Sequence, residues 1–213
     1  MDATSEGRFN DVVTSEQQLR AVLGLPLPHA LKKEITQLDG HCRDFIARSP
    51  FVVVSSSDAA GNMDVSPKGD PAGFVHVLDE RTLAVPDRPG NRRGDTFRNV
   101  LQRPHVGLLF LIPGKPETLR VAGQAIVVRD RALCERMAVQ GKVPQLALVV
   151  TVAQVFFHCA KCVLRSQLWN REAWPELTGL SSHARCIVDH ASLEDTVTEV
   201  QARLDASNTT HLY

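Results

Sequence analysis

Between residues 51 and 157 the apolar positions form short β-branched runs or alternate with polar ones, and both patterns are typical of strands. The run at 51–56 is followed by a turn at 58–61 and then by 62–66, so we expect an antiparallel pair. Because short turns join most runs, the pattern favours an antiparallel barrel over repeated strand–helix–strand units. Further strands are predicted at 74–78, 82–86, 105–112, 118–128 and 146–157.

Apolar residues at helical spacing lie before, within and after this strand region. Ser15, with Gln18 three residues later, predicts a capped short helix near the start of the chain. A second helix is predicted over 30–48, weakened in its middle by Gly40 and ended by Pro50. The other predicted helices cover 95–102, 130–138 with Asp130 as cap, a stretch near 159–169, and about 192–204 with Ser192 as cap.

Together these elements predict a mainly β fold with peripheral helices, organised in three segments. Residues 1–28 form an N-terminal arm that is broken by Pro26 and Pro28. Residues 29–175 hold all the strands and form the main domain, and residues 176–213 form a C-terminal helical extension. A chain of 213 residues is long enough for one sizeable core.

The overall charge narrows the range of partners. Lys and Arg together number 24, as do Asp and Glu, and the isoelectric point is about 7.1. Without a basic excess we expect neither nucleic acid nor an anionic membrane as partner, and no apolar run reaches the roughly 20 residues that cross a bilayer. The polar, acidic start of the chain is unlike a signal peptide, and five cysteines do not form a secreted disulfide framework, so we expect a cytoplasmic protein.

The segment 87–97 carries the densest candidate chemistry, because three guanidiniums gather where a predicted strand turns into a predicted helix. A helix N-terminus offers unpaired N–H groups and partial positive charge, and guanidinium forks match phosphate oxygens. Asn91 adds an amide donor, so the junction predicts an anion site, most naturally for a phosphomonoester. The alternative is a solvated loop whose arginines, Arg88, Arg92 and Arg93, pair with Asp87 and Asp95.

A second candidate lies upstream, where a predicted strand ends in Ser66-Pro67-Lys68. Pro67 lacks a backbone donor, so the ladder is interrupted or at an edge there. Lys68 is then free to reach a bound group, and the Ser66 hydroxyl is close by in the chain. The alternative is a surface lysine beside Asp70.

These two segments, NMDVSPKGD at 62–70 and LAVPDRPGNRR at 83–93, resemble the pyridoxamine 5'-phosphate oxidase-like FMN-binding split barrels, and specifically the FMN-dependent enzyme subgroup. The resemblance extends over roughly residues 30–175. It implies a six-stranded antiparallel split barrel and a homodimer with FMN at the interface. Shorter segments that also resemble this family follow, in the same order along the chain as in the family, at 119–123, 140–144, 156–161 and 165–169.

The resemblance also implies which residues bind the cofactor. The segment 91–93 stands where the oxidases have the Ser-Arg-Lys triplet that holds the FMN phosphate, and Lys161 is a basic candidate for a late contact. The substrate-phosphate residues of the oxidases have no counterpart, so oxidation of pyridoxamine phosphate is not implied, and no catalytic residue is predicted. The predicted cofactor-binding residues are Val65, Ser66, Lys68, Val85, Pro86, Arg88, Asn91, Arg92, Arg93 and Lys161.

We therefore predict an FMN-binding flavoprotein that transfers a hydride between a small organic substrate or NAD(P)H and the flavin. Two alternatives stay open: a non-catalytic flavin-binding or storage module, and a split barrel that binds another anionic cofactor such as a deazaflavin or haem. Cys159 and Cys162 form a Cys-x-x-Cys pair that could hold zinc or act as a redox dithiol. Ordinary thiols are the favoured interpretation of this pair, and no metal is predicted.

Overall fold

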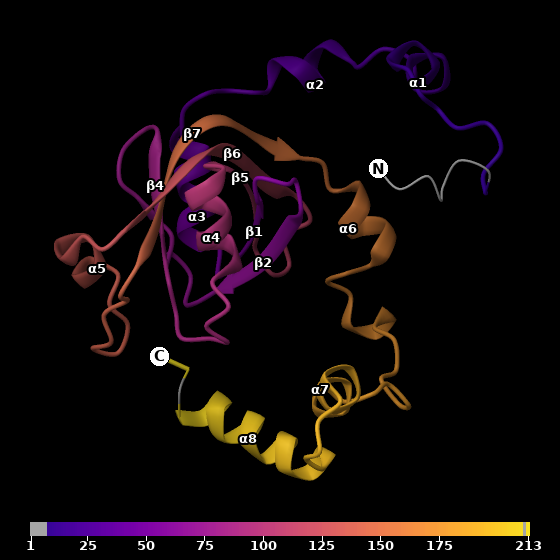
Figure 1. The fold of residues 1–213 in the computed structure, drawn as a ribbon. Helices are drawn as coiled ribbons and strands as arrows, with labels where there is room; N and C mark the ends of the chain where they lie inside the picture. The colour runs from indigo at the N-terminus through magenta and orange to yellow at the C-terminus, as the bar shows by residue number, and fades with distance from the viewer. Residues whose placement is uncertain (1–7, 211) are drawn as a thin grey trace. The chain divides into compact units, whose positions relative to one another are not determined.

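The computed structural model describes residues 8–210, 212 and 213 (Figure 1). Contacts divide the chain into two units, Met1–Glu34 and Ile35–Tyr213. The described part of the first unit contains two short helices, α1 (Glu16–Leu23) and α2 (Pro28–Lys32). The predicted cap of α1 is confirmed, because the Ser15 hydroxyl accepts from the backbone N–H of Gln18 at 3.2 Å.

The second unit is built on one sheet in which every pairing is antiparallel. Its strand order is β2-β1-β5-β6-β7-β4-β3. The mainly β fold with peripheral helices is confirmed, and the sheet has seven strands rather than six. The strands are β1 (Phe51–Ser57), β2 (Met63–Gly69), β3 (His76–Val77), β4 (Thr82–Pro86), β5 (His105–Leu111), β6 (Thr118–Val128) and β7 (Ala147–His158).

The sequence pattern predicts seven strands and the family resemblance implies six, and the strand predicted at 74–78 is present only as the two-residue β3. Only His76 and Val77 pair with β4, whereas Phe74 and Val75 are buried in the core without extending the ladder. Their hydrophobicity therefore reflects burial and not strand pairing.

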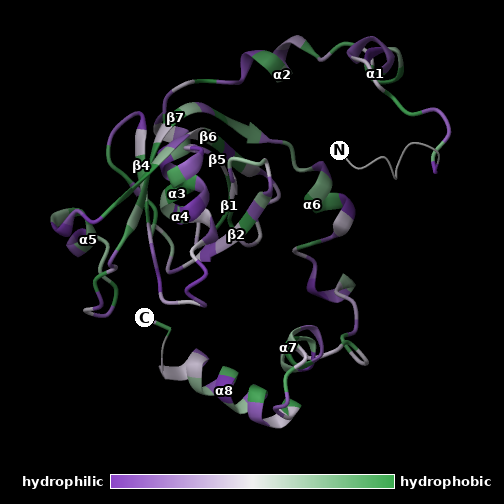
Figure 2. Cartoon of the chain, in the orientation of Figure 1, coloured by the Kyte–Doolittle hydropathy of each residue, from purple (hydrophilic) through white to green (hydrophobic). Residues whose placement is uncertain are grey.

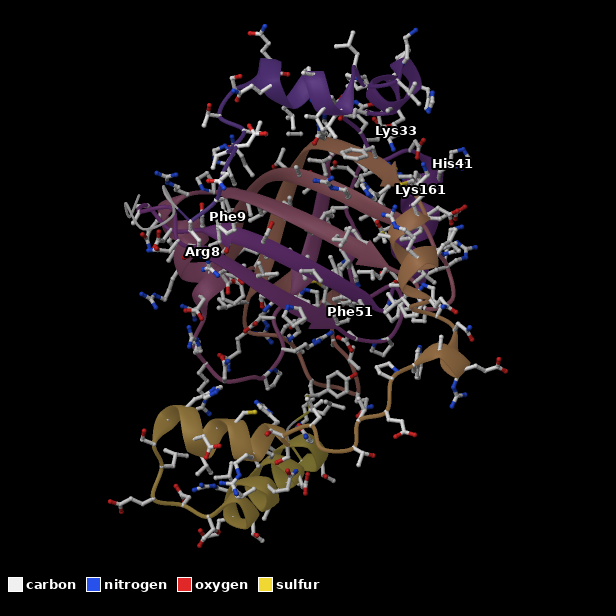
Figure 3. The ribbon with its side chains drawn as sticks, turned by 90° about the vertical axis from the view of Figure 1, so that its right-hand side faces the viewer. Arg8, Phe9, Lys33, His41, Phe51 and Lys161 are labelled. Atoms are coloured by element: carbon white, nitrogen blue, oxygen red, sulfur yellow. The ribbon has the colours of Figure 1, made fainter. Side chains whose placement is uncertain are left out.

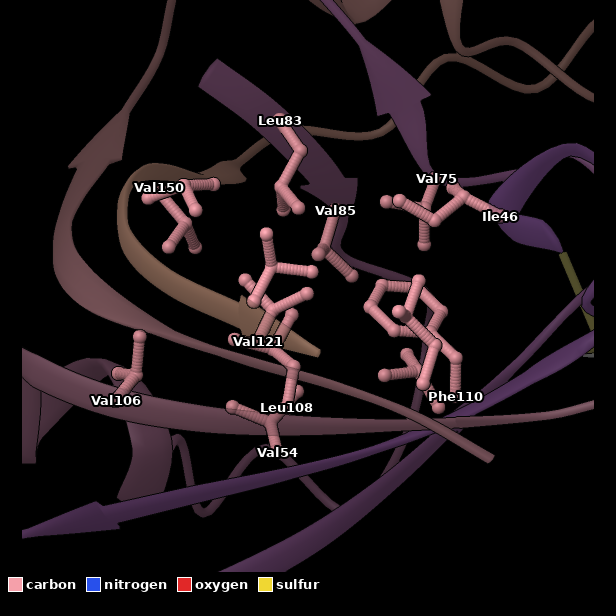
Figure 4. Close-up of a cluster of buried hydrophobic side chains, with 14 of the residues drawn as sticks. Ile46, Val54, Val75, Leu83, Val85, Val106, Leu108, Phe110, Val121 and Val150 are labelled. Carbon is pink, nitrogen blue, oxygen red and sulfur yellow. The ribbon is translucent and has the colours of Figure 1, made fainter. Parts of the chain in front are cut away.

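The inner face of the sheet encloses one large hydrophobic core (Figure 4). Alternate residues of β1 point into it, and Figure 2 shows hydrophobic colouring along β6 and β7. Helix α3 (Gly40–Arg48) packs its apolar face on the same core. The largest fully buried side chains are Phe110, Leu38, Ile46, Leu83, Leu119, Met137, Val52, Val54, Val121, Val150, Val155 and Cys42.

The helix predicted over 30–48 is wrong, because the structure has two helices separated by an extended stretch. Ile35 forms an isolated bridge with Val155 of β7, which no helical residue could do. Helix α3 begins only after Asp39, whose carboxylate accepts from the backbone N–H of Cys42 at 2.9 Å. Gly40 is the first residue of this helix and does not weaken its middle.

Two helices between strands match their predictions. Helix α4 (Asp95–Gln102) covers the predicted residues, and α5 (Arg131–Arg136) is capped by Asp130 as expected. Between β6 and β7 the register slips at Ala122 and Gly123, which is the bulge expected at this glycine.

After β7 the described part of the chain forms helices and no further strand. The helix predicted over about 192–204 is confirmed from residue 197 onward, but its predicted cap is wrong, because Ser192 adopts φ 51° and ends the preceding helix. Thr196 and Glu199 bond to each other at the start of the last helix instead. No described helix is long and apolar enough to cross a membrane. The elements that follow β7 are α6 (Lys161–Ser166), the 3₁₀ helix η1 (Arg171–Ala173), α7 (His183–Ala191) and α8 (Val197–Thr210).

Candidate functional site

The candidate site centres on the loop that leaves β4 and enters α4. The loop begins at Asp87, whose backbone N–H donates to the carbonyl of Leu146 at 3.0 Å. It ends at Gly94, which takes the left-handed conformation with φ 66° and stands at the N-cap of α4. A glycine has no side chain to cap a helix, and no other side chain of the described structure caps α4. The N–H groups of the first turn therefore remain available to another acceptor.

Of the three arginines in this loop, Arg88 and Arg93 have side-chain partners, whereas Arg92 has none among the described residues. Arg93 Nε donates to an Asp95 carboxylate oxygen at 2.6 Å, and its backbone N–H donates to the Asn91 side chain at 3.0 Å. Arg92 has φ 60° and an exposed side chain, and within the described part of the chain it forms no ion pair. The alternative of a self-neutralised loop thus holds for Arg93, and Arg92 is left with its guanidinium free.

Lys68 approaches this loop from β2. Ser66 and Lys68 lie opposite the buried Val54 and Val52 in the register, so both side chains belong to the inner face of the sheet. The Lys68 ammonium lies 6.0 Å from the ring centre of Phe97, in the first turn of α4. The structure therefore brings Ser66 and Lys68 to the same end of the sheet as the loop.

Two hydrogen bonds fix α4 against these strands, and the sequence interpretation missed both. Thr96 donates to an Asp64 carboxylate oxygen at 2.8 Å, and the Asn99 amide donates to the Ser56 hydroxyl at 3.1 Å. The signal that could have revealed the first of them is the alternation of polar side chains at Asp64, Ser66 and Lys68.

The Arg88 side chain already has hydrogen-bond partners outside the 91–93 segment. Its Nε donates to the Asp70 carboxylate at 2.5 Å and its Nη2 to the carbonyl of Met137 at 2.8 Å. The alternative in which Arg88 pairs with Asp87 is not what the structure has, because Asp70 is the acidic partner of Arg88. A direct contact between Arg88 and a cofactor stays a prediction, and the structure itself assigns Arg88 to holding three segments together.

Two titratable groups at this end of the sheet are shifted. Burial raises the pKa of the Asp87 carboxyl above its usual range, against the opposing charge of Lys68. Burial also lowers the pKa of His76, and the charges of Arg136 and Arg88 add to this effect. The half-buried surroundings therefore favour the neutral form of both groups.

The other predicted residues differ in what they can offer. Val85 and Pro86 are buried at the end of β4, where both pair with β7, and a contact of either residue with a cofactor stays a prediction. Val65 points to the outer face of the sheet, and its side chain is 64% exposed.

Lys161 is not brought to the loop within one chain. It is the first residue of α6 and lies beyond the far end of β7 (Figure 3), whereas Pro86 pairs with Ala147 at the opposite end of that strand. The neighbouring Cys159 and Cys162 are exposed free thiols. Among the described residues, no group of three or more His, Cys, Asp or Glu side chains is placed to hold a metal ion.

A family model described as pyridoxamine 5'-phosphate oxidase matches residues 38–159, which is more than half of the chain. The chain belongs to the pyridoxamine 5'-phosphate oxidase family. This match spans α3 and all seven strands, and it includes every predicted site residue except Lys161. The family resemblance drawn from the two sequence segments is thereby confirmed.

Solved structures similar to this member of the pyridoxamine 5'-phosphate oxidase family include HupZ from Group A Streptococcus, with 17% identity over 56% of this chain and 92% of that chain and a TM-score of 0.47. A putative pyridoxamine 5'-phosphate oxidase from Lactobacillus delbrueckii is 22% identical over 57% of this chain and 95% of that one, with a TM-score of 0.45. An FMN-binding protein from Syntrophomonas wolfei is 10% identical over 67% and 96%, with a TM-score of 0.42. Curated protein sequences give no match.

Proposed function

We propose that this chain binds FMN and acts as an FMN-dependent oxidoreductase on a small organic molecule or NAD(P)H. The observation that carries the proposal is the exposed, unpaired guanidinium of Arg92 beside the uncapped N-terminus of α4. Membership of the pyridoxamine 5'-phosphate oxidase family supports the same cofactor class.

The donors of the loop fit a phosphate group. Arg92 can supply a charge-assisted hydrogen bond, and Asn91 and the first turn of α4 can supply neutral donors. Arg93 is already paired with Asp95 at 2.6 Å, so a phosphate would share or replace that partner. Even with this competition, the loop offers one free cation and several free N–H groups to a dianion.

The remaining predicted residues would hold the ring system. Ser66 and Lys68 offer a hydroxyl and a positive charge from the inner face of β2, and the end of β4 offers backbone groups at Val85 and Pro86. When bound, FMN would supply the hydride acceptor and donor, and the chain would supply placement and charge. In this role Lys68 stabilises negative charge that develops on the ligand.

A homodimer with FMN at the interface completes the proposal. Lys161 lies beyond the opposite end of β7 from the loop, so a second copy offers a route for it to reach a ligand held there. The outer face of β2 is suited to such an interface, because Met63 is 67% and Val65 is 64% exposed. Exposed apolar side chains that lie close together on one strand can form part of a contact surface.

The phosphate assignment is tested by Arg92→Ala. A charge-assisted hydrogen bond contributes about 1.5–3 kcal/mol, so titration calorimetry is expected to show FMN binding weakened at least about tenfold. Riboflavin lacks the phosphate, so its affinity is expected to change little. Arg129→Ala, which removes an exposed arginine after β6, is the matched control. Equal FMN affinity in the parent and Arg92→Ala would refute the assignment.

Turnover is tested separately by adding NADH or NADPH to the FMN-loaded protein without oxygen, and then admitting air. Bleaching of the flavin absorbance followed by its return supports the oxidoreductase. Bound flavin that no nicotinamide or small-molecule donor bleaches instead supports a non-catalytic flavin-binding or storage module. An absorbance spectrum of the purified protein that shows a deazaflavin or haem overturns the choice of cofactor.

A further inference from the structure

A buried ion pair joins three segments at the base of the cofactor loop. Asp70 directly follows β2, and its side chain has 0% exposure, while the Arg88 side chain has 15%. Arg88 Nε donates to one Asp70 oxygen at 2.5 Å, and Nη2 reaches the carbonyl of Met137 after α5 at 2.8 Å. Because Arg88 lies three residues before Asn91, holding its side chain also holds the start of the loop.

The second oxygen of Asp70 is used by a residue from far along the chain. The Tyr213 hydroxyl donates to Asp70 Oδ1 at 2.8 Å, and the Arg88 guanidinium lies 5.8 Å from the centre of the Tyr213 ring. A buried carboxylate needs partners on both oxygens, and a cation against an aromatic face is attracted electrostatically. Tyr213 therefore contacts both members of the ion pair, through its hydroxyl and through its ring.

We propose that Tyr213 is a positioning residue: by bonding Asp70 and covering Arg88, it latches the segment after α8 onto the base of the 91–93 loop and fixes that loop for phosphate binding. The latch itself stands on the contacts of Tyr213, whereas its effect on phosphate binding rests on the proposed FMN site. The contacts of Tyr213 are with Asp70 and Arg88, so it acts on residues 91–93 through these two side chains.

The latch is tested by titrating the phenol, because Tyr213 is the only tyrosine in the chain. The hydrogen bond to Asp70 holds the pKa of the Tyr213 hydroxyl above its usual range, although the charge of Arg88 opposes this shift. The ultraviolet absorbance of the phenolate is therefore expected to appear at a higher pH in the parent than in free tyrosine. Tyr213→Phe provides the blank, and titration at the free-tyrosine value would overturn the latch.

The positioning role is tested by comparing FMN with riboflavin in Tyr213→Phe. Loss of one hydrogen bond that acts on the phosphate loop is expected to weaken FMN binding by about threefold to tenfold, with riboflavin affinity unchanged. A purely structural role would instead lower both affinities together, or neither. Leu212→Ala changes an exposed neighbour in the same segment and is the matched control.

Hydrogen exchange of the backbone amides at 90–94 separates this proposal from the proposed function. Faster exchange in Tyr213→Phe, with the Leu212→Ala control unchanged, is expected if the latch orders the loop. If the parent protein binds neither FMN nor riboflavin, the FMN proposal fails, and the exchange measurement alone then decides the latch. A raised phenol pKa combined with unchanged FMN affinity and unchanged exchange in Tyr213→Phe would overturn the positioning role.

Discussion

Gly123 lies where β6 slips by one residue against β7, and the space there excludes any side chain. A Cβ atom at this position would lie 2.1 Å from the carbonyl oxygen of Thr151, which is backbone and cannot rotate away. We therefore expect Gly123→Ala to reduce the free energy of unfolding by about 2 kcal/mol or more, measured by urea denaturation.

The control for this prediction is Gly40→Ala. Gly40 is the first residue of α3, and an added Cβ atom would meet nothing within 4 Å. Removing a glycine there restricts the unfolded chain, so stability is expected to stay the same or to rise by up to about 1 kcal/mol. Equal destabilisation by the two substitutions would show that the bulge does not require glycine.

The raised pKa of Cys42 leads us to expect that the protein becomes less stable at alkaline pH. Burial, followed by the hydrogen bond to Asp39, raises the pKa of its thiol from 9.0 to about 12. Above pH 9 the unfolded chain loses this proton first, so the free energy of unfolding falls as pH rises from 9 towards 12. Below pH 9 the thiol is neutral in both states and has no effect on the pH dependence.

The slope from one such group is at most about 1.4 kcal/mol per pH unit. Urea unfolding at about pH 8 and about pH 10 is expected to show a smaller decrease in Cys42→Ala than in the parent. The difference between the two proteins isolates Cys42 from the raised pKa values of Cys134 and Tyr213. Parallel pH dependences would contradict the assignment.

At the scale of elements, α4 depends on two polar contacts with the sheet. Ser56→Ala leaves the buried Asn99 amide without its acceptor, and the expected loss is about 1–3 kcal/mol in the free energy of unfolding. Ser57→Ala is the control, because Ser57 belongs to the opposite face of the same strand. If both variants unfold at the same urea concentration as the parent, the contact does not stabilise α4.

Elements were predictable where one strong pattern excluded the alternatives. The long strand 118–128 and the helix 95–102 match the structure residue for residue. The prediction of one helix over 30–48 is wrong, because Ile35 and Leu38 are apolar for reasons other than a helical face. Ile35 forms a bridge with Val155, and Leu38 is buried in the core. Helical spacing of apolar residues does not distinguish a helix from a chain that crosses the core by another path.

At the scale of the whole molecule, the site was predictable only where it is continuous in sequence. The segments 65–68 and 91–93 could be proposed from the sequence because polar and basic residues lie next to one another in each of them. The Asp70–Arg88 pair spans 18 residues and the Tyr213–Asp70 bond spans 143, so no local pattern signals either contact. Only the folded sheet, which places the ends of β2 and β4 together, brings these groups into contact.

The division into two units implies that the sheet does not need the N-terminal unit, Met1–Glu34, to fold. All seven strands and the core lie within Ile35–Tyr213. A chain that lacks residues 1–34 is therefore expected to unfold in one cooperative transition at a temperature within a few degrees of the parent, as recorded by circular dichroism. Loss of the cooperative transition would show that residues 1–34 and the sheet fold as one unit.

If the chain forms the proposed homodimer, one substitution on the outer face of β2 is expected to change both dimer formation and FMN binding. Val65 is exposed on the outer face of β2, so Val65→Glu would place a charge in an interface formed there, and burial of an unpaired charge is costly. Light scattering after size exclusion is expected to show a dimer for the parent and a monomer for Val65→Glu. FMN binding is expected to weaken with the loss of the dimer, although Lys68 and Arg92 are intact. Val22→Glu changes a 77% exposed valine in α1 and should leave the dimer unchanged. A parent protein that binds one FMN per chain as a monomer would refute the interface, because Lys161 would then have to reach the ligand from beyond the far end of its own β7.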